Sequence, residues 1–432
     1  MVETPTQLLR KRREAAAAAL GEGMMVLPAA PAGPHAYRPD RELYYLTGAT
    51  EPETVAVLTG GADPKLHLFV RERDVEAELW HGPRLGPEGT AERLEPDACH
   101  PLGELATRLP DLLRDADRIF FRLGRGGDTE RHVRDALGFA RGRGARTGTG
   151  PRAVVDPGEI LDELRLLKDA HELALLRRAA EVTVEGHRAA AARIAPGEGE
   201  WALEAILHAT FRSSGGRGPG YESIVGSSGN ACVLHYVDNA CVIAEDALVL
   251  VDAGAEYGFY NGDVTRTYPA AGRLEGAPRE IYELVEAARS AAVSAVKPGC
   301  PVGGVHDAAT RVLVEGLVGL GVLTGDVDTL IADEMYKPFY PHQTSHWLGL
   351  DVHDPGDYAR KGASRNLEPG MVLTVEPGLY FRPAHEKTPA RLAGIGVRIE
   401  DDIAVTADGH EVLTAALPTA ADEVAALVRA AG

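Results

Sequence analysis

The sequence lacks the features of a disulfide-stabilised, membrane-spanning or nucleic-acid-binding protein. Its 4 cysteines show no C-x-x-C spacing, which excludes a zinc ribbon or a redox pair and agrees with a reducing compartment. No apolar run reaches the roughly 18 residues of a transmembrane helix, and residues 1–21 predict a charged amphipathic helix without a signal peptide's apolar core. Phosphate binding needs clustered Lys and Arg, whereas 64 acidic and 45 basic residues give a net charge of -19. We therefore expect a cytoplasmic protein with no nucleic-acid and no membrane partner.

The length and composition are those of a globular protein with more than one domain. At roughly 150 residues per domain, 432 residues predict two or three domains. The 25% of charged and 44% of hydrophobic residues are ordinary for a chain that folds in water. A chain of this length buries a substantial core without disulfides or structural metals. A metal site in it is therefore not needed for stability and indicates chemistry instead.

Two regions with different patterns follow one another. In residues 1–156 short apolar runs alternate with helical stretches, which predicts an α/β domain. The turn signal at Asp156-Pro157-Gly158 predicts a boundary, and residues 157–432 form the second domain. Asp169 and Glu172 have the spacing of a capping box at the start of a long helix. The later part mixes helices at 278–296 and 305–321 with strand-like runs at 247–251, 264–268, 371–375 and 397–405.

Two hairpin-like units in the second domain repeat one unusual feature. Each unit, at 247–269 and at 371–405, carries two acidic residues on strands that otherwise look buried. In the first, an antiparallel return predicts that Asp252 and Asp263 lie opposite each other. The second unit carries Glu376 and Glu400. Because unpaired carboxylates are costly to bury, we expect the four acids to face one cavity.

Three histidines lie between the two hairpins, at His342, His346 and His353. A single acid in this pattern is more often a solvated carboxylate, or one paired with Arg266 or Arg398, than a ligand. Four acids beside histidines instead indicate a metal site, and mostly oxygen donors favour a hard ion such as Mn²⁺. Carboxylates can also bridge two ions, about 3.5–4 Å apart, which hold a hydroxide as nucleophile. The reaction class that this arrangement favours is hydrolysis.

The motifs of the second domain resemble those of the pita-bread metallopeptidases, and among them the Xaa-Pro aminopeptidases, or aminopeptidase P. The resemblance also covers the N-terminal half, in Tyr45-Leu-Thr-Gly48 and Glu78-Leu-Trp80-His. It implies an α/β N-terminal domain and an α+β pita-bread domain whose pseudo-two-fold antiparallel sheet encloses a dinuclear site. The motifs of the second domain run in the order Tyr221-Glu-Ser-Ile-Val-Gly, Val251-Asp252-Ala-Gly, Gly262-Asp263-Val-Thr-Arg, Ser345-His346-Trp-Leu-Gly, Thr374-Val-Glu376-Pro-Gly and Arg398-Ile-Glu400-Asp.

The resemblance also implies roles for individual residues. Two divalent ions, usually Mn²⁺ with Co²⁺ or Zn²⁺ as alternatives, would be held by Asp252, Asp263, His346, Glu376 and Glu400. Glu376 is the expected general base and acid, since such a carboxylate must reach both water and leaving nitrogen. The other implied catalytic residues are His342, His353, His235 and Arg398, and relatives assemble as dimers or tetramers. One departure is Gln343, where family members commonly carry glycine.

The implied substrate is a peptide that begins with Xaa-Pro. A bond to proline is a tertiary amide without an N–H and with a fixed φ, so it needs a dedicated pocket. Residues beside the expected ligands that suit a proline ring are Tyr236, His235, Trp347, His353 and Tyr380. His342 is a further expected substrate-binding residue.

Two other functions fit the same motifs. A Xaa-Pro dipeptidase, or prolidase, has the same fold and ligands, although Ser345-His346-Trp347 resembles the aminopeptidases more closely. A catalytically silent pita-bread protein that binds peptides or a partner is the third reading, which the presence of all five ligand positions disfavours.

Overall fold

The computed structural model describes residues 5–30 and 37–429, which divide into two compact units, Met1–Arg165 and Leu166–Gly432. The division lies later than the expected boundary after residue 156. Helix α7 (Gly158–Leu166) belongs almost wholly to the first unit, where the Tyr45 hydroxyl donates to the Leu164 carbonyl at 2.8 Å. None of the described helices is both long and apolar enough to cross a bilayer.

The first unit is an α/β domain, as predicted, built on one six-stranded mixed sheet with the order β4-β3-β2-β1-β5-β6. Strand β1 (Met24–Pro28) lies inside the sheet, antiparallel to β2 (Val55–Thr59) and parallel to β5 (Arg118–Phe120). The remaining elements are α1 (Pro5–Leu20), α2 (Arg41–Thr47), β3 (Leu66–Val70), α3 (Val75–His81), α4 (Gly86–Leu94), β4 (Ala98–Pro101), η1 (Leu102–Glu104), α5 (Leu105–Leu112), α6 (Gly127–Thr147) and β6 (Ala153–Val155). The predicted helix over residues 1–21 is α1, and residues 1–4 of that prediction lie outside the described residues.

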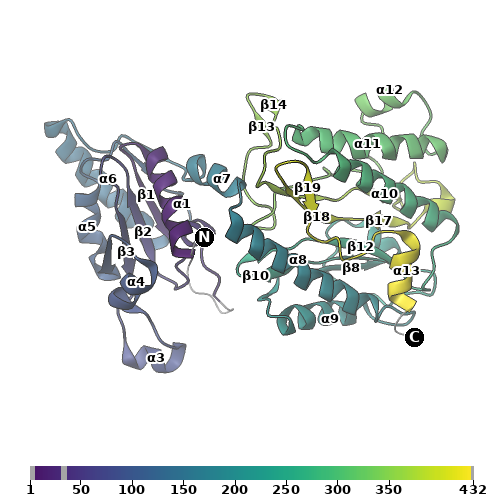
Figure 1. Ribbon diagram of the computed structural model, residues 1–432, viewed down its shortest axis with the longest axis horizontal. Helices are drawn as coiled ribbons and strands as arrows, with labels where there is room; N and C mark the ends of the chain where they lie inside the picture. Colours follow the sequence, from purple (N-terminus) through teal and green to yellow (C-terminus); the bar gives the residue numbers. More distant parts are fainter. Residues whose placement is uncertain (1–4, 31–36, 430–432) are drawn as a thin grey trace. The chain divides into compact units, whose positions relative to one another are not determined.

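The second unit consists of two similar halves, each a small antiparallel sheet covered by a pair of long helices (Figure 1). One half holds α8 (Ala170–Ala191), α9 (Glu200–Ser213), β7 (Gly218–Pro219), β8 (Ile224–Ser227), η2 (Ser228–Cys232), β9 (Leu248–Asp252), β10 (Ala255–Tyr257), β11 (Tyr260–Asn261) and β12 (Thr265–Pro269). The other holds α10 (Gly276–Ala295), α11 (Val302–Gly319), α12 (Val327–Ala332), β13 (Ala359–Arg360), β14 (Ala363–Ser364), β15 (Val372–Val375), β16 (Gly378–Tyr380), η3 (Ala390–Leu392), β17 (Gly396–Arg398), β18 (Asp401–Val405), β19 (His410–Val412) and α13 (Ala421–Arg429). The sheets β12-β9-β8 and β15-β18-β19 correspond to the two predicted hairpins.

The predicted capping box begins α8. The Asp169 carboxylate accepts from the backbone N–H of Glu172, and the Glu172 carboxylate accepts from the N–H of Asp169. Directly before it, Lys168 donates to Asp354 at 3.0 Å, and both side chains are 1% exposed. Asp354 also accepts from the N–H of Asp351. This buried ion pair therefore fixes the loop that carries His353 to the start of α8.

The Lys168–Asp354 pair gives a stability prediction. Removing one partner of a buried pair leaves the other charge unpaired, so Lys168→Met should cost about 3–5 kcal/mol of unfolding free energy. Urea unfolding followed by tryptophan fluorescence measures it. The matched control is Lys337→Met, whose pair with Glu334 is about half exposed on both sides and should leave stability unchanged. Equal stability of the two variants would contradict the prediction.

Candidate metal centre and substrate pocket

The first hairpin brings Asp252 and Asp263 to one face of a sheet. Asp252 ends β9 and pairs in register with Thr265, not with Asp263 as predicted, so the expected direct opposition is wrong. Asp263 precedes Thr265 by two residues, and positions two apart on an extended chain point to the same face. The Tyr221 hydroxyl contacts both carboxylates, with 2.6 Å to Asp252 Oδ1. The two acids therefore share one hydrogen-bond donor.

The second pair of side chains meets because two extended segments run side by side. The N–H of Glu376 donates to the Thr344 carbonyl and the N–H of Thr374 donates to the His346 carbonyl. This pairing places His346 Nε2 at 3.5 Å from Glu376 Oε1 and at 3.4 Å from Asp263 Oδ2. His346 Nδ1–H donates to the Trp347 carbonyl at 3.1 Å, which leaves Nε2 turned to the acids.

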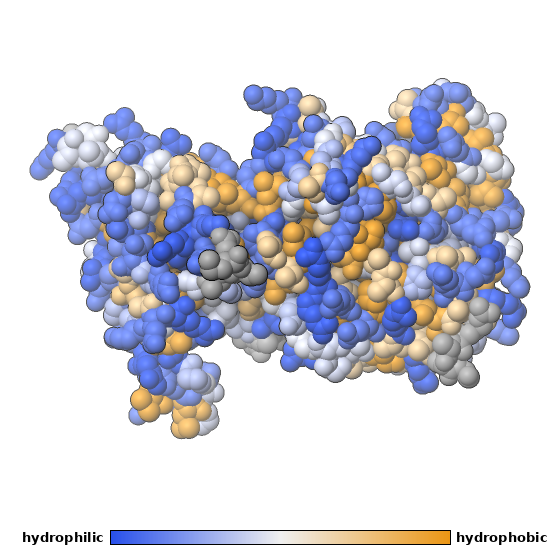
Figure 2. Space-filling model, viewed as in Figure 1, coloured by the Kyte–Doolittle hydropathy of each residue, from blue (hydrophilic) through white to orange (hydrophobic). Residues whose placement is uncertain are grey.

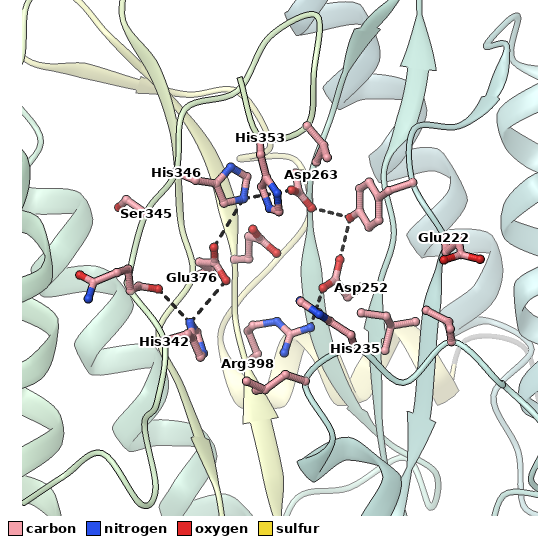
Figure 3. Close-up of a pocket in the computed structure, with 17 residues that line it drawn as sticks. Glu222, His235, Asp252, Asp263, His342, Ser345, His346, His353, Glu376 and Arg398 are labelled. Carbon is pink, nitrogen blue, oxygen red and sulfur yellow. Dashed lines mark hydrogen bonds and ion pairs between the residues drawn. The ribbon is translucent and has the colours of Figure 1, made fainter. Parts of the chain in front are cut away.

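Glu400 joins the two hairpins. Its N–H donates to the Thr265 carbonyl at 3.0 Å, and its carboxylate accepts from the Thr265 hydroxyl at 2.6 Å. Ligand atoms of Asp263, His346 and Glu400 all lie within 4.8 Å of one another. Glu400 is 2% and Asp263 4% exposed, so this group lies out of water. The prediction that the acids of both hairpins face one cavity is confirmed by this geometry (Figure 3).

The electrostatics of the group fit a bound cation. Burial, with Asp263 and Glu376 nearby, raises the pKa of Glu400 well above its ordinary value. Burial also raises the pKa of Glu376 to about 7. Burial opposes protonation of His346, but its contacts with Asp263 and Glu376 raise its pKa to about 9. Protein groups thus leave part of the negative charge uncompensated, and buried carboxylate and imidazole donors are those that divalent metals take.

A chain of hydrogen bonds leads from Asp252 to His342. Arg398 donates to Asp252 Oδ2 at 2.5 Å, to the Thr265 hydroxyl at 3.0 Å and to the Tyr380 hydroxyl at 2.9 Å. Because Tyr380 accepts from Arg398, its own proton points to His342 Nε2, 2.9 Å away. His342 Nδ1–H then faces the Gln343 carbonyl at 2.8 Å. Burial and the charge of Arg398 lower the pKa of His342 to about 3, so this ring is neutral.

The acids form the floor of a cavity of about 470 Å³. His235, His342 and His353 line it, and the His353 ring packs edge-on against His346 with centroids 4.4 Å apart. The other lining residues are Tyr221, Glu222, Ile224, Leu234, Val237, Gln343, Ser345, Val352 and Arg398, beside the five expected ligands. Figure 3 shows the labelled side chains converging on the cavity from both halves of the unit.

Tyr236 differs from its predicted role as a pocket residue. It is not among the lining residues, and its hydroxyl donates to Glu200 at 2.9 Å, away from the acids. Tyr380 likewise is not a lining residue and acts on the pocket through His342 and Arg398. Leu234 and His235 lie in a turn that faces the cavity, and Tyr236, which follows the turn, directs its hydroxyl to α9 instead. Trp347 is fully buried and is not a lining residue either.

Sequence reasoning missed two residues that organise the acids. Tyr221 bridges Asp252 and Asp263, and its place in the Tyr221-Glu-Ser-Ile-Val-Gly motif was the available signal. Asp402 is fully buried and accepts from the N–H of Asp263 at 3.1 Å, and burial raises its pKa well above the ordinary value. The role of Asp402 could not be predicted from the sequence, because it is the third of three consecutive acidic residues and nothing in the pattern distinguishes it.

The fold and the site together define a metal-dependent hydrolase made of two similar halves. Residues 174–407 match metallopeptidase family M24, and residues 9–120 match the aminopeptidase P N-terminal domain. The chain therefore belongs to metallopeptidase family M24 and has the pita-bread fold of that family.

Comparisons over the whole chain are more specific. The chain is 41% identical to the Xaa-Pro aminopeptidase of Escherichia coli, over 100% of this chain and 99% of that protein. The structure of Pseudomonas aeruginosa aminopeptidase PepP matches with a TM-score of 0.94 and 43% identity, covering 100% and 99% of the two chains. Zinc-substituted E. coli aminopeptidase P in complex with product matches with a TM-score of 0.94 and 40% identity, covering 100% of both.

The shifted pKa values predict how the metal-free protein responds to pH. Since the pKa of His346 is raised from 6.5 to about 9, the folded chain binds more protons than the unfolded chain between these values. Its contribution to stability is complete below 6.5 and is lost as the pH rises toward 9. Chelator-treated protein should therefore lose thermal stability across this range, and added Mn²⁺ should restore it. A melting temperature of metal-free protein that rises from pH 6.5 to 9 would contradict this assignment.

Proposed function

We propose that this chain releases the N-terminal residue from peptides whose second residue is proline, as a metal-dependent Xaa-Pro aminopeptidase. The observation that carries the proposal is the full-length similarity to Xaa-Pro aminopeptidases, together with the buried acids at the floor of the pocket. The acidic floor suits the positive amino end of a peptide.

The proposed ligands are the five residues that meet between the hairpins. Buried oxygen and imidazole donors come from Asp252, Asp263, His346, Glu376 and Glu400. Tyr221 orients the two aspartates, and Thr265 orients Glu400. When bound, two divalent cations activate water and polarise the scissile carbonyl. We favour Mn²⁺ because four of the five donors are carboxylates, with Co²⁺ and Zn²⁺ as alternatives that metal analysis of the purified protein distinguishes.

The remaining roles follow from position. Glu376 takes the proton of the attacking water and passes it to the proline nitrogen, since its carboxylate faces the cavity beside His346. His235 and His353 line the cavity and contact the substrate. The neutral His342 presents a fixed tautomer, held by Tyr380 and Arg398, near the scissile bond.

The pocket favours an aminopeptidase over a prolidase. A Xaa-Pro dipeptide ends in a carboxylate that requires a cationic partner. Among the described residues that line the cavity, Arg398 is the one Arg or Lys, and its guanidinium already donates to Asp252, Thr265 and Tyr380. A longer peptide places its terminal carboxylate beyond the pocket, so no such partner is needed.

We also propose that the chain forms homo-oligomers in the cytoplasm. Helix α3 of the first unit exposes three apolar side chains, Val75, Leu79 and Trp80, to about 80% each. Figure 2 shows hydrophobic side chains at the tip that this helix forms. A cluster of this kind is typical of a protein–protein interface, and light scattering of the purified protein determines the assembly.

Substrate length tests the proposed function. The metal-loaded protein should release Xaa from a Xaa-Pro-Xaa tripeptide and from longer peptides, and it should leave Xaa-Ala-Xaa intact. Chromatography of the products measures both. Release from a Xaa-Pro dipeptide alone would instead identify a prolidase.

The role of Glu376 gives a second test. Glu376→Gln keeps the shape of the side chain but removes its charge and its ability to carry the proton, so kcat should fall to below about 1% of the wild-type value. Circular dichroism should show an unchanged fold. Glu368→Gln, an exposed change in the same unit, is the matched control and should retain full activity. Substantial turnover by Glu376→Gln would remove it as base and ligand.

A further inference from the structure

A buried carboxylate lies behind the wall of the pocket. Glu200, the first residue of α9, is fully buried, and its carboxylate accepts five hydrogen bonds. The donors are the Ser227 N–H at 2.7 Å, the Ser227 hydroxyl at 2.7 Å, Asn230 Nδ2 at 3.2 Å, the Tyr236 hydroxyl at 2.9 Å and the Cys241 N–H at 2.8 Å. Within the described residues no Lys, Arg or His forms an ion pair with Glu200. The five donors, and the N-terminal end of α9, are therefore what compensates its charge.

All five donors come from one irregular segment, 227–241. This segment leaves β8, passes through η2 and returns toward β9 with little regular structure. The Cys241 carbonyl also accepts from the Glu200 N–H at 2.9 Å, so the contact between the two residues is reciprocal. Asn239, likewise buried, pairs with Val225 and Ser223. Beyond Ser227, the last residue of β8, the segment contains no helix or strand outside η2, so it depends on these polar contacts for its shape.

The same segment supplies one wall of the pocket. Leu234, His235 and Val237 line the cavity, and they lie between the residues that Glu200 holds. Glu200 itself does not line the cavity. The two carboxylate oxygens bind different ends of the segment. Oε1 accepts from the N–H of Ser227 at its beginning, and Oε2 accepts from the N–H of Cys241 at its end. The carboxylate thus fixes both ends of the wall to one helix terminus.

We propose that Glu200 is a positioning residue for substrate recognition, which sets the place of Leu234, His235 and Val237 against the residue next to the scissile bond. The inference rests on the proposed function for its substrate. The expected ligands lie on other segments, four of them around β9, β12, β15 and β18, and His346 in the loop between α12 and β13. Loss of the Glu200 anchor therefore weakens peptide binding and leaves metal binding intact.

Two variants, compared with a matched control, measure the effect. Glu200→Gln keeps the shape but replaces one oxygen by a donor, so either the Ser227 or the Cys241 N–H loses its acceptor. KM for a Xaa-Pro-Xaa tripeptide should rise about tenfold, with kcat changed less than about twofold and metal content unchanged. Hydrogen exchange at residues 227–241 should become faster. Tyr236→Phe removes one of the five donors to Glu200, together with the acceptor of the Ala240 N–H, and should raise KM by a smaller factor.

The matched control is Glu204→Gln, one turn further along α9, which should leave KM and exchange at the wild-type values. Values for Glu200→Gln within twofold of this control would overturn the inference, as would faster exchange with an unchanged KM. Should Glu200→Gln not fold, Tyr236→Phe decides, and its unchanged KM would overturn the inference. Should wild-type protein bind but not cleave the tripeptide, the proposed function fails, and calorimetric affinities of the same variants still test the anchor.

Discussion

The structure of the second unit depends on the convergence of acidic side chains in a place with little water. Asp263 and Glu400 are almost fully buried, and Glu376 and Asp252 approach them from the other strands. Like charges at such distances repel strongly at low dielectric. Arg398 compensates part of this charge through its ion pair with Asp252. Pairing of one of the acids with Arg398 was the alternative that the sequence left open. The remainder requires protons or cations, and burial together with the neighbouring carboxylates raises the pKa values of Glu376 and Glu400.

The backbone around the acids is arranged to hold them in spite of this repulsion. Thr265 is central, since it pairs with Asp252, accepts the N–H of Glu400 and donates its hydroxyl to the Glu400 carboxylate. Asp402 holds the N–H of Asp263 in the same way. Further polar contacts hold the residues that line the substrate pocket. Lys168 pairs with Asp354, next to His353, and Glu200 accepts from Tyr236, next to His235. Pre-organisation of this kind places both ligands and substrate contacts before a peptide arrives.

Much of this arrangement could be predicted from the sequence. Acidic residues on strands that otherwise look buried are informative, because a buried carboxylate needs a partner, and this pattern identified both hairpins. The capping box of Asp169 and Glu172 was readable for a similar reason, since its hydrogen bonds are local. Register was not readable, because a turn of unknown geometry separates Asp252 from Asp263. Tyr236 was misplaced since nothing in the sequence says that its neighbour, rather than itself, faces the cavity. Contacts such as Glu200 with Cys241 depend on tertiary structure, which no local pattern encodes.

The most direct test of this account is the number and place of the bound ions. Crystals grown with Mn²⁺ and measured by anomalous diffraction at the manganese edge locate each ion. The account predicts two anomalous peaks between the hairpins, in contact with Asp252, Asp263, His346, Glu376 and Glu400. A single peak or none at this place, or ions bound to other residues, would contradict it.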